Sequence, residues 1–262
     1  MFYMWFLCEM VNLYIMKSIF KINPVTYFLL LSILMCGYFN YFVVIFVILF
    51  FHEIGHMMMI KLFNEKIKKI EILPFGAIIK MDMQANISSI KLFLISSFGI
   101  VMQFFLYVPF EYLYNNGVIN DLTYQIFLTY NKLIILFNIM PVVPLDGSKV
   151  LGSILEMIIP YKLNLKLINI VSVFVIVIFL SINDFNLSLI VIECFLVMET
   201  LKLIRSHNYI FNSFLLERYL YNIEHKRVKR VRSIKNIYKN YYNFINNIRE
   251  RDVLAAKFKP FN

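Results

Sequence analysis

The sequence predicts an all-α polytopic membrane protein with about six transmembrane helices. Its 262 residues are 60% hydrophobic and 16% charged, whereas soluble globular domains are nearer half apolar and a quarter charged. The apolar residues are also gathered into runs of about 20, which suits a hydrocarbon core about 30 Å thick. Residues 22–51 contain no Asp, Glu, Lys or Arg. Together these observations exclude an ordinary soluble domain.

Six segments have the length and apolarity of transmembrane helices. The first apolar run extends to about residue 63, which is enough for two helices with a turn near Gly37 and Asn40. The later stretch 69–82 is rich in β-branched residues and is broken by Pro74 and Gly76, so we expect a short β-hairpin or a membrane-dipping loop after the second helix. The expected helices are residues 22–38, 41–63, 91–113, 122–145, 167–182 and 185–204.

The charges of the connecting loops predict the orientation in the membrane. Alternate loops carry lysine and arginine, while the loops between them carry acidic residues only. Cytoplasmic loops hold the positive excess, so both termini are expected in the cytoplasm. The basic loops contain Lys61, Lys66, Lys68 and Lys69, then Lys149, Lys162 and Lys166, then Lys202 and Arg205; the acidic loops contain Glu111, Asp121 and Asp184.

The second expected helix carries the motif H-E-x-x-H, formed by His52, Glu53 and His56. Ionisable groups are costly inside a bilayer, at about 3 kcal/mol each, and are rare there without a function or a partner. Residues four apart share one helix face, so both imidazoles can reach one zinc ion while Glu53 accepts a proton from water. The alternatives are a buried polar pair without metal, or a membrane transporter or scaffold that carries the motif by chance.

A catalytic zinc needs a third protein ligand, and the segment 138–147 offers one. Pro141 and Pro144 prevent a regular helix, and the carbonyls that they free must be satisfied by protein or by a water-filled cavity. Asp146 then supplies a carboxylate, and Gly147 permits a sharp turn behind it. An ordinary helix end with an Asp-Gly turn explains the same residues, but beside an intramembrane H-E-x-x-H a metal ligand is favoured.

These motifs together resemble those of the site-2 intramembrane metalloproteases, which carry H-E-x-G-H on one span and N-x-x-P-x-x-P-L-D-G about 85 residues later. The resemblance runs from about Lys17 to Tyr221 and implies a zinc endopeptidase with one Zn²⁺ per chain. It implies that His52, His56 and Asp146 are the metal ligands and that Glu53 is the catalytic base. It also implies that Asn138 contacts the substrate or stabilises the oxyanion. The supporting residues that it implies are Pro141, Pro144, Gly147 and Phe75.

A narrower resemblance, to the sporulation branch of this family, rests on the segments 73–76, 144–147 and 214–219. It implies a membrane-tethered pro-sigma factor as substrate, membrane-embedded inhibitory partners, and a place in the mother-cell membrane around the forespore. The chain would then cleave a bilayer-associated substrate with zinc-activated water and release the sigma factor from its pro-form. One departure from the family is Gly99-Ile100 in place of Gly-Pro, which puts a kink in the third span in question.

The chain divides into three expected parts. Residues 1–21 are an interfacial segment or an extension, residues 22–204 the six-span protease domain, and residues 205–262 a basic cytoplasmic tail with 13 Lys/Arg against 4 Asp/Glu. No recognition motif accompanies this charge, so no direct nucleic-acid partner is expected. The tail looks too short for the nucleotide-binding CBS domain of the family. We expect a truncated remnant that aids docking to the substrate or the membrane and takes no part in the chemistry.

Overall fold

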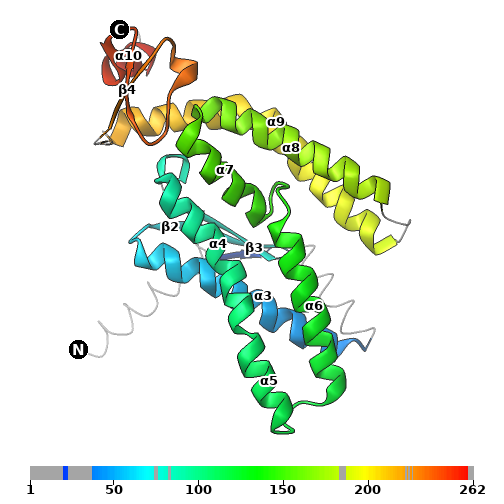
Figure 1. Cartoon of the computed structure of the whole chain (residues 1–262). Coiled ribbons are helices and arrows are strands. Elements are labelled where there is room, and N and C mark those ends of the chain that lie inside the picture. The colour runs from blue at the N-terminus through cyan, green and yellow to red at the C-terminus, as the bar shows by residue number, and fades with distance from the viewer. Residues whose placement is uncertain are drawn as a thin grey trace, which may run out of the picture. The chain divides into compact units, whose positions relative to one another are not determined.

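The computed structural model describes residues 20–22, 37–73, 76–81, 84–182, 187–221, 223, 225 and 227–258, which are mostly helical (Figure 1). The chain forms two compact units, each described here by itself. Unit 1 comprises residues 1–84 and 98–134, and unit 2 comprises residues 85–97 and 135–262. Two helices, α4 (Ser89–Phe105) and α6 (Asp121–Ile139), contribute residues to both.

Unit 1 is built on helix α3 (Phe39–Leu62), which contains the H-E-x-x-H motif. Val44 and Ile48 on α3 pack with Leu106, Ile126 and Phe127 in an apolar core. Helix α5 (Tyr107–Asn115) follows α4 after Leu106, and the ring of its Phe110 stacks on Phe127 with centroids 3.7 Å apart. The outer face of α3 is also apolar, as expected for a helix that meets lipid on one side and protein on the other.

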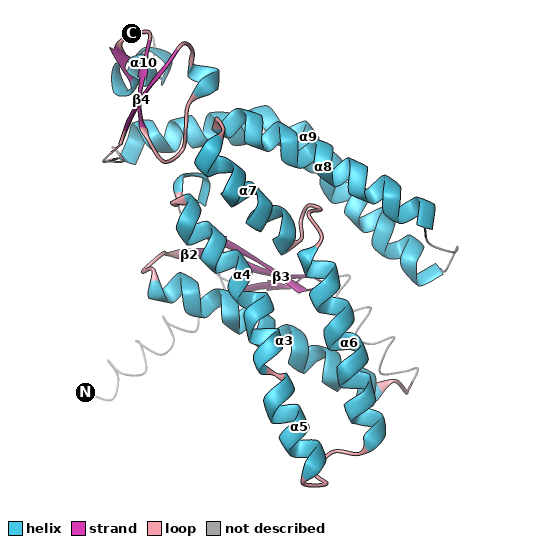
Figure 2. Cartoon of the chain, in the orientation of Figure 1, coloured by secondary structure: helices cyan, strands magenta, loops and turns pink. Residues whose placement is uncertain are grey.

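A three-stranded sheet completes the described part of unit 1. Strand β2 (Ile67–Leu73) lies in the middle, paired in parallel with β1 (Phe20–Ile22) and antiparallel with β3 (Gly76–Met81), as the strands of Figure 2 show. The β-branched stretch after the histidine helix therefore forms two paired strands. Phe75, predicted as a supporting residue, lies outside the described residues, as does most of the first predicted span.

By length and composition, three described helical segments could cross a membrane: Phe39–Leu62, Ser89–Asn115 and Tyr161–Ser181. The prediction of an integral membrane protein agrees with them, while the count of six stays a prediction. Some limits differ from those expected. Helix α6 ends at Ile139 rather than at residue 145, because Pro141 has no N–H to continue it. Helix α9 runs from Leu187 to Tyr221, well beyond the expected residue 204.

Unit 2 contains α7 (Asp146–Ile158), α8 (Tyr161–Ile182) and α9. Helices α8 and α9 lie side by side (Figure 1), and Ile176 and Leu196 pack against Val142 and Leu145 from the segment before α7. This packing places the proline-containing segment on a two-helix support.

The residues after α9 fold into a small module, defined here as residues 228–258. Strand β4 (Val228–Val231) pairs in parallel with β5 (Tyr242–Ile245), which pairs antiparallel with β6 (Ile248–Arg249) before helix α10 (Glu250–Phe258). A short 3₁₀ helix (Ile234–Asn236) lies between β4 and β5. Phe214 and Leu215 of α9 share a buried core with Ile237 and Leu254 of the module, which explains why α9 continues past the apolar span.

Candidate metal centre

The two histidines of the motif converge on α3. His52 is 3% exposed and His56 7%, and their Nε2 atoms lie 3.0 Å apart. Two nitrogens that each lie about 2.0–2.1 Å from a tetrahedral zinc ion are separated by about 3.3 Å, so the observed spacing is close to that of a metal-bound pair. The rings are nearly perpendicular, with centroids 4.6 Å apart. The histidine pair therefore fits a shared cation.

A buried amide chain sets the tautomer of His52. Its Nδ1 lies 3.1 Å from Gln103 Oε1, and Gln103 Nε2 in turn donates to Asn131 Oδ1 at 3.4 Å. Asn131 Nδ2 donates a hydrogen bond to the backbone carbonyl of Gln103, which fixes the orientation of the Asn131 amide. Asn131 Oδ1 is then an acceptor, so the Gln103 side chain must present its Nε2 to Asn131 and its Oε1 to His52. Gln103 Oε1 is then an acceptor, so the proton of His52 resides on Nδ1 and the lone pair on Nε2. Metal-binding histidines are commonly oriented in this way by a second partner.

Sequence reasoning missed both Gln103 and Asn131. The signal was present, since each is a polar residue within an expected apolar span, and both are fully buried in the structure. Their side chains satisfy each other and His52 at a depth where water cannot. The H-E-x-x-H motif lies on one helix and does not indicate which residues of other helices contact it.

Gly99 allows helix α4 to approach the histidine pair. A Cβ placed on Gly99 would lie 2.5 Å from His56 Cε1 and Nε2 and 2.8 Å from His52 Cε1. Gly55, one turn from His52, packs equally closely against the carbonyl of Phe98. The departure from Gly-Pro in the sequence is thus of little consequence for Gly99 itself, whose role is close packing. Helix α4 continues through this position, and the helical run is interrupted only at Leu106.

Glu53 follows His52 on α3 and is half-buried. Its Oε2 atom is shielded from solvent. A carboxylate next to a ligand histidine has the position needed for a general base, which must reach a water molecule beside the metal.

Asp146, in unit 2, is the first residue of α7 and is 5% exposed. Its Oδ1 atom lies 2.8 Å from Lys149 Nζ, one turn further along the helix. Gly147 is helical and does not form the turn expected of it. Its lack of a side chain matters because a Cβ there would collide with the backbone of Ile139 and Met140.

Side chains of α8 and α9 form hydrogen bonds with the backbone of the proline-containing segment before Asp146. Ser172 Oγ on α8 accepts from Val143 N at 3.2 Å and donates to the Pro141 carbonyl at 3.5 Å. Thr200 on α9 donates to the Val143 carbonyl at 3.5 Å. This agrees with the expectation that backbone groups freed by the prolines are satisfied by protein. Asn138 is half-buried on the last turn of α6, and Pro141 and Pro144 lie between that helix and α7.

The donor chemistry suits zinc. In the described residues, unit 1 offers the imidazoles of His52 and His56, and unit 2 offers the carboxylate of Asp146. Two imidazoles and one carboxylate form a common ligand set of catalytic zinc, which leaves a fourth position for water or substrate.

Comparison with known proteins agrees with this chemistry. Residues 40–117, which include His52, Glu53 and His56, match the model of Peptidase family M50. The chain is a relative of the site-2 metalloproteases of that family. It is 28% identical over 190 residues to Stage IV sporulation protein FB of Bacillus subtilis (strain 168), covering 71% of this chain and 66% of that protein. It is 29% identical over 118 residues to a zinc metalloprotease of Methanocaldococcus jannaschii, covering 44% of this chain and 34% of that one.

A solved structure has a fold similar to that of this chain. The Site-2 Protease from Methanocaldococcus jannaschii superposes with a TM-score of 0.54 at 23% identity and covers 70% of this chain and 89% of its own. The predicted resemblance is therefore confirmed, and so is zinc as the cofactor of this family. Asp146 lies outside the segment matched by the family model, so its role rests on the motif and on its donor chemistry.

Gly99→Ala should disturb the histidine pair, because the added methyl group would overlap the His56 imidazole. We expect zinc retention by the detergent-purified chain to fall about tenfold or more, as for other changes that misplace a ligand. Metal content after dialysis against a chelator measures this. Gly152→Ala is the matched control, since its Cβ would meet its neighbours only at ordinary distances of 3.6–3.7 Å. Equal zinc content in the two variants would contradict the role given to Gly99.

Gln103→Leu should weaken metal binding by about 10–100-fold, because His52 loses the acceptor that holds its tautomer. Competition with a chromogenic chelator gives the affinity. Gln125→Leu removes an exposed glutamine from another helix and serves as the control. An unchanged affinity in Gln103→Leu would show that the amide chain does not orient the ligand.

Proposed function

We propose that this chain is an intramembrane zinc endopeptidase that cleaves a membrane-associated protein. The observation that carries the proposal is the buried histidine pair, whose Nε2 atoms lie 3.0 Å apart on an apolar helix that also bears Glu53. The Gln103 contact leaves His52 Nε2 as the atom that faces His56, which is the orientation a metal ligand needs. The M50 match over this helix adds independent support.

Each residue has a separate task in this proposal. His52, His56 and Asp146 hold the metal, which when bound supplies a Lewis acid that makes water a better nucleophile near neutral pH. Glu53 takes a proton from the attacking water and returns it to the departing amine nitrogen. Asn138, near the end of α6, donates a hydrogen bond to the substrate or to its developing oxyanion. Pro141, Pro144 and Gly147 shape the segment that presents Asp146.

The sheet of unit 1 suits an extended substrate. A transmembrane substrate must unwind before hydrolysis, because helical carbonyls are hydrogen-bonded and shielded. Strand β3 lies at one edge of the order β1-β2-β3, and an unwound segment could pair with it as an added strand. Alternate side chains of the substrate would then face the protein, which gives a basis for sequence preference.

The substrate we propose is a sporulation sigma factor in a membrane-tethered pro-form. The support is the similarity to Stage IV sporulation protein FB and the apolar helices of this chain. In that setting the chain would act in regulated intramembrane proteolysis in the mother-cell membrane around the forespore, restrained by membrane-embedded inhibitory partners.

Glu53→Gln should abolish cleavage, by a factor of at least about 10², while leaving the metal in place, because only the proton acceptor is lost. The test is co-expression with a pro-sigma factor that has a hydrophobic prosequence, with the product read by gel mobility and zinc measured on the purified chain. Glu111→Gln, an exposed position on α5, is the control. Near-normal cleavage by Glu53→Gln would refute its role as the base.

The orientation is a separate proposal, motivated by the loop charges. Reporter fusions after Asn64, Lys162 and Ser206 should report the cytoplasm, and fusions at Gly117 and Asp184 the opposite side. A cytoplasmic signal at Gly117 would overturn both the six-span topology and the cytoplasmic placement of the termini.

A further inference from the structure

A buried ion pair ties the C-terminal module to helix α7, the helix that begins with Asp146. Lys239 Nζ of the module lies 2.8 Å from Glu156 Oε2 near the end of α7, and the two side chains are 2% and 6% exposed. Glu156 also accepts hydrogen bonds from Ser89 Oγ and Asn164 Nδ2, each at 3.2 Å. Removing two charges from water costs several kcal/mol per ion, so such a pair is a weak source of net stability. Its value lies in fixing the geometry of the groups that it joins.

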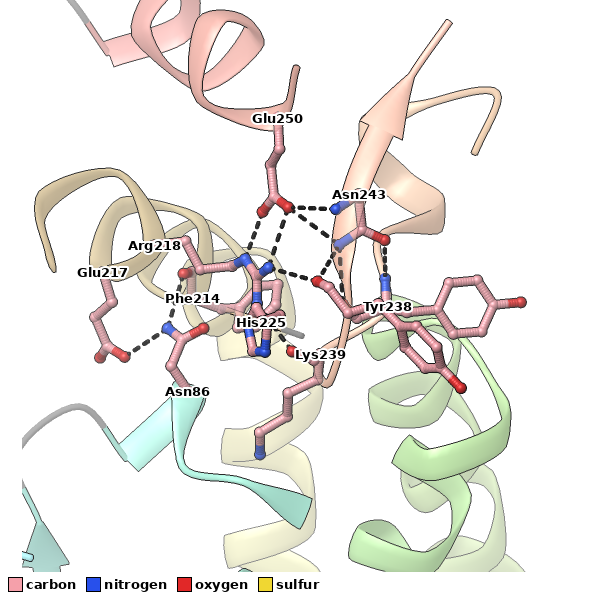
Figure 3. A network of polar contacts seen from close by, with 10 residues as sticks. Asn86, Phe214, Glu217, Arg218, His225, Tyr238, Lys239, Asn243 and Glu250 are labelled. Carbon is pink, nitrogen blue, oxygen red and sulfur yellow. Dashed lines mark hydrogen bonds and ion pairs between the residues drawn. The ribbon is translucent and has the colours of Figure 1, made fainter. Parts of the chain in front are cut away.

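The backbone of Lys239 is held in turn by Arg218 of α9, as Figure 3 shows. Arg218 Nη1 donates to the Lys239 carbonyl at 2.9 Å, and Nη2 donates to the Tyr241 carbonyl at 2.8 Å. The same guanidinium forms a bidentate pair with Glu250, which also accepts from Asn243 N at 2.9 Å. Arg218 thereby fixes the position from which the Lys239 side chain reaches α7.

The surroundings keep this guanidinium in place. His225 Nε2 lies 3.0 Å from Arg218 Nη1, and burial together with the neighbouring guanidinium lowers the pKa of His225 to about 4. A neutral imidazole can accept the hydrogen bond from Arg218 at physiological pH. The Arg218 guanidinium also lies over the Phe214 ring, 5.5 Å from its centroid.

Helix α7 is constrained at both ends. At its start, Gly147 leaves no room for a side chain against the backbone of Ile139 and Met140. At its other end, Glu156 is held by the ammonium of Lys239 and by two neutral donors. Ten residues of helix separate Asp146 from Glu156, a length of about 15 Å. A helix of this length behaves as a stiff rod, so rotation or sliding at Glu156 is transmitted to Asp146.

We infer that Lys239 and Glu156 are positioning residues for Asp146, so that the folded C-terminal module sets the third metal ligand through helix α7. The inference rests on the proposed role of Asp146 as a ligand. It differs from the expectation that the tail serves in docking alone. In this inference the module acts through α7, which it contacts at Glu156. Loosening the module would weaken metal retention while leaving the histidine pair of α3 intact.

Lys239→Met tests this in the full-length chain in detergent micelles. It should lower zinc retention against a chelator by about tenfold, as expected when an outer partner of a ligand is lost. Hydrogen exchange of the α7 amides 147–152 should also become faster. Lys235→Met removes the same charge from an exposed site of the module and should change neither readout. Glu156→Gln removes the charge at the other end of the pair while its amide oxygen can still accept a hydrogen bond, and it should change both readouts in the same direction as Lys239→Met.

Two results would overturn the inference. One is Lys239→Met with zinc retention and α7 exchange equal to those of Lys235→Met. The other, which remains decisive if Lys239→Met does not fold, is a folded Glu156→Gln chain whose zinc retention and α7 exchange equal those of the unaltered chain. Failure of the proposed protease function can be told apart from failure of this inference. If the unaltered chain binds zinc but cleaves nothing, zinc retention and α7 hydrogen exchange can still be measured in every variant. If Asp146→Ala leaves zinc retention unchanged, the ligand assignment fails, while α7 exchange still reports the coupling of Lys239 to this helix.

Discussion

The need to satisfy polar side chains in an apolar environment governs this protein. The imidazoles of α3 are buried among apolar helices, where each polar nitrogen needs a partner. Gln103 Oε1 forms a hydrogen bond with His52 Nδ1, and Gln103 Nε2 donates a hydrogen bond to Asn131 Oδ1. The Nε2 atoms of His52 and His56 then lie 3.0 Å apart, a spacing close to that of two nitrogens bound to one zinc ion. The same constraint acts in unit 2, where Ser172 and Thr200 satisfy the backbone around the prolines.

Close approach of helices is the second requirement, and small residues provide it. Gly55 and Gly99 bring α3 and α4 together around the imidazoles, and Gly147 brings the start of α7 against the end of α6. In each case the glycine is helical and its importance comes from the space that a side chain would occupy. This differs from the usual reason for glycine in a motif, which is a backbone conformation that other residues avoid. In the described residues, positive φ at glycine occurs at Gly37 and Gly117, both away from the histidines.

The C-terminal module shows how a basic segment can be structural as well as charged. Most of its positive charge is exposed, but Lys239 is buried and paired with Glu156 of α7, and Glu250 of the module is paired with the buried Arg218 of α9. These two pairs join the module to α9 and to α7. A positive net charge in the sequence does not distinguish a solvated arginine from one enclosed by carbonyls and a carboxylate. That distinction decides whether the tail is a peripheral docking segment or a support for the ligand helix.

The sequence by itself determined the membrane character, the histidine helix and the metal chemistry. Charge-free apolar runs and the order H-E-x-x-H are local patterns, and a helix with four-residue spacing follows from backbone geometry alone. It also marked Asp146 through the prolines before it, because breaking a helix is a local property of proline. Tertiary structure alone decided that Gln103 and Asn131 serve His52, that Gly99 faces the imidazoles, and that Lys239 meets Glu156 83 residues away in sequence. Such pairings depend on which helix faces meet after folding, and no local pattern of polarity or spacing specifies them.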